Sequence, residues 1–332
     1  MHTERTQLDS IEPTDAQELY LKYKATEVTD KTLRTHKYRT NYFVQWCEEQ
    51  GIDDMNDVTG RHLQEYRLWR EEDGDLAQIS LNQQMATIRV FLQWCASIEA
   101  VPADLYEKVM VPRVSPEQQR REEMLETETA EAILDHLSTF SYASVEHAVI
   151  AVLWETGIRL GAANSLNVAD VDVEDERIEL VHRPEQDTQL KNAQGGERPI
   201  AITPGLAGLL EDYIEHTRHD VMDDYGHRPL FATTRGRMHR TTLRGVVYRA
   251  TAPCFRNEPC PDCTGTADKK CGEAVSPHAI RRGSITHYLT EDVPVEVIGD
   301  RMDVSRDVLD KHYDKRSEDV KLEQRRGYLE NL

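Results

Sequence analysis

The sequence predicts a mainly α-helical protein with a small antiparallel β-sheet, divided into an all-helical N-terminal domain and an α+β C-terminal domain. Residues 13–103 repeat their apolar side chains at helical spacing, whereas 178–182 and 198–202 alternate like two short strands. Residues 104–125 hold two prolines and a charged run, which is the composition of an interdomain linker. The second predicted domain is therefore 126–332.

Four helices are predicted in the N-terminal domain. In residues 32–46 and 80–94 apolar side chains recur every three to four positions, and Gly51 stops the first of these helices. Weaker patterns predict two further helices, at 14–25 and 60–71.

The C-terminal domain is predicted to contain shorter elements. Thr127 is a suitable N-cap for a first helix, and Gly157 ends a second helix that begins near residue 144. A turn at 192–196 joins the two strands. Further helices are expected after Arg159 and at 205–219, 240–250, 278–290 and 295–302, followed by a tail, 317–330, that is a polar helix or disordered.

The chain is acidic, with 60 Asp and Glu against 40 Lys and Arg and a net charge of −20. A bulk charge of this sign disfavours nucleic acid and anionic membranes as partners, because both would repel it. Only 11 of the basic residues are Lys. An acid excess with few lysines is typical of a halophilic archaeon, where molar salt screens self-repulsion within a few ångströms.

Four segments of the chain contain no Asp or Glu at all. Residues 31–47, 76–98, 226–257 and 274–290 together carry +14, so the rest of the chain carries −34. Chance clustering on solvated helix faces could produce short windows of this kind, but it poorly explains one of 32 residues. Basic windows in an acidic chain favour a salt-adapted nucleic-acid binder. The candidate DNA-binding residues are Lys31, Arg34, Lys37, Arg39, Arg235, Arg237, Arg240 and Arg244.

No segment predicts a membrane protein. The longest uncharged apolar run, from Ala148 to Trp154, is too short to cross a bilayer, and the first ten residues lack the apolar core of a signal peptide. We expect a cytoplasmic, nucleoid-associated protein.

Five residues that could carry phosphoryl chemistry occur in four separate motifs. In HAIRR, His278 and Arg281 are three residues apart and share a helix face. Arg159 lies in TGIRLGAANSLNVADVD, Lys191 in LKNAQGGERPIAI and Tyr313 in DVLDKHYDK. Taken singly, each residue has an ordinary structural explanation: Arg159 could cap a helix, Lys191 could be a charge at a hairpin tip, and Tyr313 could be a surface aromatic residue. Their combination and order are far more specific.

In this order the motifs resemble those of the tyrosine recombinase family, which includes phage integrases and Xer-like proteins. The resemblance covers the whole chain. TLRTHKYRTNYFVQWCEEQGI and SLNQQMATIRVFLQWC resemble the family's SAM-like core-binding domain, and residues 126–332 resemble its catalytic domain. This implies a site-specific recombinase for integration, excision or dimer resolution that needs no cofactor for catalysis. It also implies double-stranded DNA as a partner and a homotetramer on synapsed sites, monomeric or dimeric when free, in which the tail 314–332 docks on a neighbouring subunit.

The resemblance also implies a role for each of the five residues. Arg159 and Arg281 would clamp the non-bridging phosphate oxygens, and Tyr313 would attack phosphorus to form a 3′-phosphotyrosyl link. His278 and the two arginines would activate the tyrosine, as a base or as a strongly cationic surround, and Lys191 would protonate the leaving 5′-hydroxyl. Such help is needed because a free tyrosine, with a pKa of about 10, is barely ionised at neutral pH.

Two positions depart from the family pattern. Val304, nine residues before Tyr313, stands where the family has His or Trp, so one hydrogen bond to the phosphate is missing or comes from another group such as His312. Ala162 replaces a Glu that supports packing in the family, which we expect to matter little. The alternatives are a catalytically impaired DNA-binding regulator, which Val304 would favour, and a type IB topoisomerase-like enzyme.

Four of the six cysteines form a C-x5-C-x2-C-x7-C pattern in an insertion at 254–271. Four thiolates suit a tetrahedral structural zinc, with free thiols or two disulfides as the alternatives. Disulfides are disfavoured inside a cell. Cys47 and Cys95 are expected in helix cores. The predicted zinc ligands are Cys254, Cys260, Cys263 and Cys271.

Overall fold

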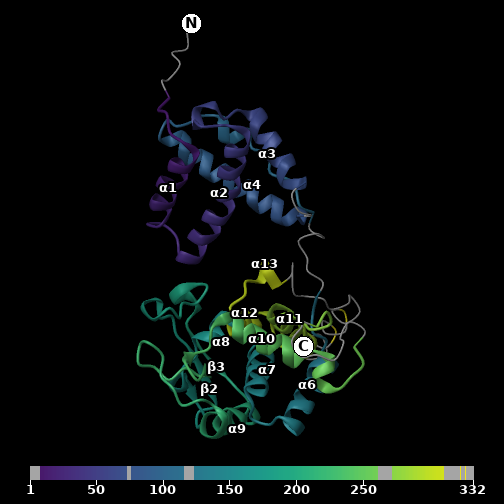
Figure 1. The fold of residues 1–332 in the computed structure, drawn as a ribbon. Coiled ribbons are helices and arrows are strands. Elements are labelled where there is room, and N and C mark those ends of the chain that lie inside the picture. The colour runs from purple at the N-terminus through teal and green to yellow at the C-terminus, as the bar shows by residue number, and fades with distance from the viewer. Residues whose placement is uncertain are drawn as a thin grey trace. The chain divides into compact units, whose positions relative to one another are not determined.

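The chain divides into two compact units, Met1–Arg121 and Glu122–Leu332, which we call the N-terminal and C-terminal units. Helices dominate both (Figure 1). The computed structural model describes residues 8–72, 76–115, 123–260 and 271–309 and the single positions 322 and 326.

The described part of the N-terminal unit contains four α-helices. They are α1 (Pro13–Lys24), α2 (Asp30–Gln50), α3 (Gly60–Glu72) and α4 (Gln78–Ser97). Thr29 caps α2 by accepting a hydrogen bond from the Thr32 amide, and Gly51 ends it in the left-handed conformation. The helices enclose an aromatic core in which the rings of Phe43 and Trp46 both contact Tyr66. The four predicted helices are confirmed.

The start of the predicted linker, 104–125, belongs instead to the N-terminal unit. Residues Leu105–Lys108 form a 3₁₀-helix, and the side chains of Leu105 and Val109 are buried in the aromatic core. Proline and charge content predicted that the interdomain linker begins at residue 104. Two apolar side chains four residues apart are enough to anchor its first part, because each gains the full burial free energy of a core residue.

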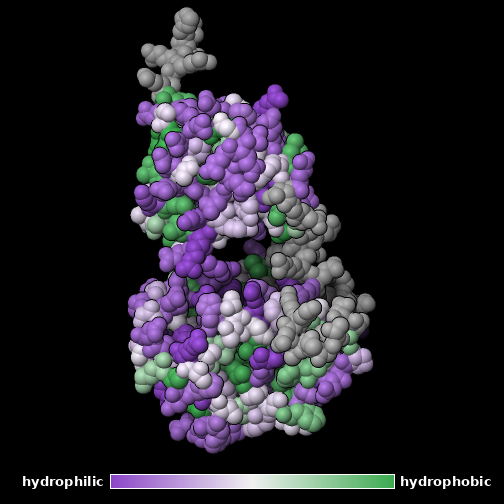
Figure 2. Space-filling view, viewed as in Figure 1, coloured by the Kyte–Doolittle hydropathy of each residue, from purple (hydrophilic) through white to green (hydrophobic). Residues whose placement is uncertain are grey.

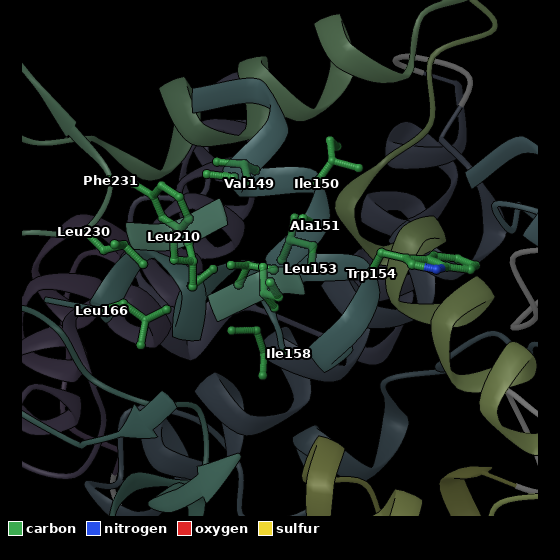
Figure 3. Packing of buried hydrophobic residues seen from close by; sticks show 14 of the residues in the cluster. Val149, Ile150, Ala151, Leu153, Trp154, Ile158, Leu166, Leu210, Leu230 and Phe231 are labelled. Atoms are coloured by element: carbon green, nitrogen blue, oxygen red, sulfur yellow. The ribbon is translucent and has the colours of Figure 1, made fainter. Parts of the chain in front are cut away.

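The helix α7 (Val145–Thr156) forms the centre of the C-terminal unit. Nine of its twelve residues are buried, so most of its surface faces the core, as expected of a central helix. Figure 3 shows Val149 and Leu153 packed among side chains that include Leu210 and Phe231. The other helices of the unit are α6 (Thr127–Phe140), α8 (Leu160–Ser165), α9 (Pro204–Asp212), α10 (Arg240–Thr251), α11 (Pro277–Thr290), α12 (Val295–Met302) and α13 (Arg306–Val308).

A three-stranded antiparallel sheet accompanies these helices. Its order is β1 (Val171–Asp172), β2 (Arg177–Leu180) and β3 (Arg198–Ala201). Ile178 pairs with Ile200 across the two longer strands, and both are buried in the core. The predicted strand pair is confirmed. A short hairpin of β4 (Ala232–Thr233) and β5 (Gly236–Arg237) was not predicted, because two-residue strands carry no detectable alternation.

A second apolar cluster joins α11 to α12. It contains Ile285 and Leu289 from α11, Ile298 and Met302 from α12, and the adjacent Val304. This cluster packs α12 against α11. Hydrophilic residues cover most of the face visible in Figure 2, and no helix in the described ranges is both long and apolar enough to cross a membrane. The predicted fold class, mainly α-helical with a small antiparallel sheet, is confirmed.

Candidate active site

Four of the five predicted catalytic residues lie in the described part of the C-terminal unit. Arg159 is the N-cap residue of α8, Lys191 lies in the loop between β2 and β3, and His278 and Arg281 lie in the first turns of α11. Tyr313 lies outside the described residues, as does most of the tail.

A sharp turn at Gly157 brings Arg159 to this site. Gly157 ends α7 with a φ of 60°, and a Cβ atom there would lie 2.6 Å from the Met302 sulfur. Any other side chain would therefore be strained by its backbone conformation and would collide with α12. The turn lets the chain enter α8 directly beside the end of α12.

The end of α12 accepts hydrogen bonds from three arginines. Three successive carbonyl oxygens, those of residues 301, 302 and 303, accept from Arg198 Nε at 2.9 Å, Arg281 Nη2 at 2.7 Å and Arg159 Nη2 at 2.8 Å. The last carbonyls of a helix lack partners within the helix and carry partial negative charge. They therefore fix guanidinium groups that originate in β3, α11 and the α7–α8 turn.

The two candidate catalytic arginines differ in exposure. Arg281 is 2% exposed and also donates to the Gly157 carbonyl at 2.6 Å, whereas about a quarter of the Arg159 side chain reaches solvent. Arg281 thus organises the turn before Arg159 and places a buried positive charge behind it.

Asp303 adds a carboxylate to this cluster of cations. One carboxylate oxygen forms an ion pair with Arg159, and the other accepts a hydrogen bond of 2.7 Å from Asn192 Nδ2. Asp303 itself adopts the left-handed conformation, with a φ of 51°, as the C-cap residue of α12. The carboxylate partner of Arg159 thus comes from a residue 144 positions further along the chain.

The electrostatic setting of His278 favours its neutral form. Although the side chain reaches solvent, burial of the ring lowers the pKa of His278, and four nearby positive charges lower it further. A lowered pKa keeps the imidazole unprotonated at neutral pH, the state in which it can accept a proton. The four charges, in decreasing order of effect, are those of Arg282, Arg281, Arg159 and Lys191.

Val304 contributes no hydrogen-bond donor to the site. Its side chain is 8% exposed and packs in the apolar cluster between α11 and α12. The candidate substitute, His312, lies outside the described residues.

The predicted DNA-binding residues of the N-terminal unit all lie on α2, and three of them lie around one cavity. Lys31, Arg34 and Lys37 are exposed on α2, and no ion pair within the described ranges involves them. Arg39 donates to two neutral side chains of α4, at 2.7 and 3.1 Å. Lys31, Arg34 and Arg39 line a cavity of about 430 Å³ at the surface between α2 and α4.

The predicted DNA-binding residues of the C-terminal unit fall into two groups. Arg235, Arg240 and Arg244 take part in no ion pair in the described portion of the chain. Arg237, in contrast, lies 2.7 Å from the Asp223 carboxylate and donates to two backbone carbonyls at 3.0 and 3.1 Å. Its guanidinium is therefore occupied within the fold by the Asp223 carboxylate and two backbone carbonyls.

The cysteine cluster is only partly described. Cys260 and Cys271 place their sulfur atoms 3.3 Å apart, Cys254 is exposed, and Cys263 lies outside the described residues. Among the described residues no three His, Cys, Asp or Glu side chains are grouped as metal ligands. Cys47 and Cys95 are fully buried, as predicted, and burial raises the pKa of the Cys47 thiol to about 12.

Sequence reasoning missed three residues of this site: Asn192, Arg198 and Asp303. Asp303 had a detectable signal, because it directly precedes Val304 within the segment that departs from the family pattern. Asn192 and Arg198 had none, since only the fold brings them to the end of α12.

Comparison with known proteins identifies the class to which this fold and site belong. The phage integrase family matches residues 123–318, and the SAM-like N-terminal domain of phage integrases matches 17–97. The chain belongs to the phage integrase family.

Relatives within the family are distant. Tyrosine recombinase XerC from Herpetosiphon aurantiacus is 22% identical over 282 residues, which cover 82% of this chain and 81% of the relative. Tyrosine recombinase XerC 2 from Ralstonia nicotianae is 27% identical over 149 residues, 42% of each chain. The Tn1549 transposon integrase, solved in complex with circular intermediate DNA, has a similar fold, with a TM-score of 0.68 at 14% identity over 95% of this chain and 99% of that one.

These findings confirm the predicted family, fold and class of activity. The protein is a tyrosine-type, site-specific DNA recombinase, an enzyme of a family that needs no cofactor for catalysis. The two alternatives, a regulator without catalysis and a topoisomerase-like enzyme, are not favoured.

Proposed function

We propose that this recombinase exchanges strands of double-stranded DNA through a 3′-phosphotyrosyl intermediate formed by Tyr313, in integration, excision or dimer resolution. The observation that carries the proposal is the meeting of Arg159 and Arg281, 122 residues apart in sequence, at the last carbonyls of α12. His278 lies within electrostatic reach of both arginines and of Lys191.

The proposed reaction uses each group according to its surroundings. Tyr313 attacks phosphorus, and its proton passes to the neutral His278. Arg159, which reaches solvent, binds the non-bridging oxygens, while the buried charge of Arg281 adds to the positive potential. Lys191 donates a proton to the 5′-oxygen as its bond to phosphorus breaks. The reverse steps rejoin the strands, so no external energy source is needed.

DNA binding is assigned to the exposed cations of both units. We propose that Lys31, Arg34, Lys37 and Arg39 contact phosphates from the N-terminal unit, and that Arg235, Arg240 and Arg244 do so from the C-terminal unit. By analogy with the family, the working assembly is a homotetramer on two synapsed sites. The acidic remainder of the surface suits cytoplasm with molar salt, where bulk repulsion from DNA is screened and the enzyme can act at the nucleoid.

A nicked suicide substrate tests the catalytic proposal. Cleavage near the nick releases a short fragment, so religation fails and the covalent protein–DNA adduct accumulates. In high-salt buffer we expect the wild type to form an adduct that survives denaturing electrophoresis, and Tyr313→Phe, which lacks only the hydroxyl, to form none. A wild type that binds the DNA but yields no adduct would contradict the proposal and favour a regulator.

The cysteine-rich insertion is the basis of a second proposal, a structural zinc ion held by four thiolates. It is supported by the C-x5-C-x2-C-x7-C spacing and by the 3.3 Å between the Cys260 and Cys271 sulfur atoms. Two sulfurs sharing a tetrahedral zinc lie about 3.8 Å apart, given zinc–sulfur bonds of roughly 2.3 Å. Elemental analysis should find one zinc per chain in the wild type and in Cys47→Ser, and less in Cys263→Ser. A metal-free wild type would contradict it.

A further inference from the structure

We propose that Asn192 and Asp303 are positioning residues that tie the loop carrying Lys191 to Arg159, so that proton donor and phosphate clamp are placed together. This inference rests on the proposed function. It concerns two residues that the family pattern does not mark.

The first observation is the way the Lys191 loop is held. The loop joins β2 to β3, and Lys191 itself is exposed. Within the loop, the Leu190 amide donates to His182 Nδ1 at 3.0 Å, which stabilises the loop internally. Asn192, the residue next to Lys191, donates outward to Asp303 at the end of α12, 111 residues away in sequence.

The second observation is that Asp303 serves both partners at once. One carboxylate oxygen binds Asn192 and the other binds Arg159, and the Asp303 carbonyl accepts a further hydrogen bond from Arg159 at 2.8 Å. The Asp303 side chain is 18% exposed, so solvent screens the ion pair only partly. A displacement of Asp303 would therefore move the loop and the guanidinium together.

The third observation is that α12 holds Asp303 in place. As the C-cap residue of α12, Asp303 has a left-handed backbone. Arg281 anchors the preceding carbonyl, and Arg198, at the start of β3, anchors the one before that. The anchor point of the loop is thus a fixed part of the unit.

Anchoring matters most for a lysine. Its ammonium stands on a flexible four-carbon stem, so an unanchored ammonium rarely occupies the distance needed for proton transfer. A general acid must approach within about 3 Å of the oxygen that it protonates. Fixing Asn192, the residue next to Lys191, restricts the positions that the Lys191 ammonium group can occupy around the 5′-oxygen.

Asn192→Ala tests the tether without touching a catalytic residue. The matched control is Gln194→Ala, an exposed residue of the same loop whose side chain has no hydrogen bond within the described ranges. Each variant is assayed by single-turnover cleavage of the suicide substrate in two forms, one ordinary and one with sulfur in place of the 5′-bridging oxygen. In both forms the tyrosine oxygen bonds to phosphorus as the 5′ bond breaks. The alkoxide needs a proton to leave, whereas the far less basic thiolate, with a thiol pKa of about 8.5, leaves without one.

We expect Asn192→Ala to cleave the ordinary substrate about tenfold more slowly than wild type, a part of the 100-fold or larger contribution of a general acid. On the sulfur substrate it should match wild type within twofold, and Gln194→Ala should match wild type on both. Asp303→Asn, which tolerates the left-handed backbone but loses the ion pair, should be slow on both substrates because Arg159 is also misplaced.

Two outcomes would overturn the inference: equal slowing of Asn192→Ala on both substrates, or no slowing on either. A wild type that cleaves neither substrate would instead contradict the proposed function. DNA affinity and thermal unfolding of each variant, measured in the same buffer, show whether a slow variant is folded and bound.

Discussion

Residues 31–47 and residues 226–257 are two basic windows that contain no acidic residue. They look alike in the sequence, but in the folded protein they differ in how many of their cations form ion pairs. In the N-terminal window, Lys31, Arg34 and Lys37 remain exposed and outside the ion pairs of the described residues. In the C-terminal window, four of seven arginines pair with carboxylates that lie outside the window. These pairs are Arg228–Asp220, Arg237–Asp223, Arg249–Glu146 and Arg256–Glu258.

The difference shows that local charge in a sequence is not local charge in space. More than half of the seven positive charges in residues 226–257 are paired with carboxylates. These carboxylates come from residues on both sides of the window and from α7. The window of +4 keeps most of its charge. The surface of the N-terminal unit should therefore contribute more to DNA binding per cation than the larger window does.

The largest expected effect is on stability, from breaking the buried pair of the C-terminal window. Asp223→Ala would leave Arg237 without its carboxylate in a largely buried place, and removing one partner of a buried pair typically costs about 3–5 kcal/mol. Urea unfolding at fixed salt measures this. Asp175→Ala, which removes an exposed carboxylate 3.5 Å from Arg177, is the control and should cost under about 1 kcal/mol. Equal costs would contradict the distinction between buried and exposed pairs.

The ion pair between Asp223 and Arg237 should also make the unfolding free energy depend on pH. Burial raises the pKa of Asp223, but hydrogen bonds from the His227 amide and Arg237 outweigh it, and the net pKa is lowered. A carboxyl with a lowered folded-state pKa stabilises the fold above its unfolded pKa of about 3.9, and this contribution is lost as pH falls through the folded value. Between pH 5 and 3, wild type should lose more unfolding free energy than Asp223→Asn. Parallel curves would show that Asp223 does not contribute.

A smaller effect is expected on DNA binding. Two double variants, each of which removes two positive charges, can be compared. The first is Lys31→Ala with Arg34→Ala, and the second is Arg228→Ala with Arg249→Ala. The first pair should weaken binding about tenfold and reduce the slope of log K against log salt by about 2, because each lost phosphate contact removes roughly 0.9. The second should change the slope little, since Asp220 and Glu146 already balance its charges. Fluorescence anisotropy at several salt concentrations measures both, and equal slopes would contradict the comparison.

The smallest effect is expected from the exposed pair of the C-terminal window. Half of the Arg249 side chain is exposed where it meets Glu146, so Arg249→Ala should lower the unfolding free energy by less than about 1 kcal/mol. Arg244→Ala, with no ion pair among the described residues, should change it by less still. Thermal unfolding of both variants is the measurement, and a large loss for Arg244→Ala would reveal a structural role for that residue.

Much of the fold could be predicted because helical and strand periods are local properties. The helices around Trp46 and Trp94, the end of α7 at Gly157 and the pairing of the strands with Ile178 and Ile200 were all readable from neighbouring residues. The packing of Leu105 and Val109 was not, because burial depends on what lies opposite in space.

The candidate site divides in the same way. Short motifs in a fixed order were enough to name four candidate catalytic residues: Arg159, Lys191, His278 and Arg281. In the structure, charges of the other three act on His278. The occupation of Arg237 and the link between Asn192 and Asp303 could not be named, since their partners are 14 and 111 residues away.

By itself, then, the sequence determined the helices, the strand pair and the residue types needed for strand exchange, because periodicity and motif order are written along the chain. Tertiary structure alone decided which cations stay free and where Arg159 finds its carboxylate. The physical reason is that the free energy of a charge depends on distance and burial in three dimensions, to which residues far apart in sequence contribute as much as neighbours do.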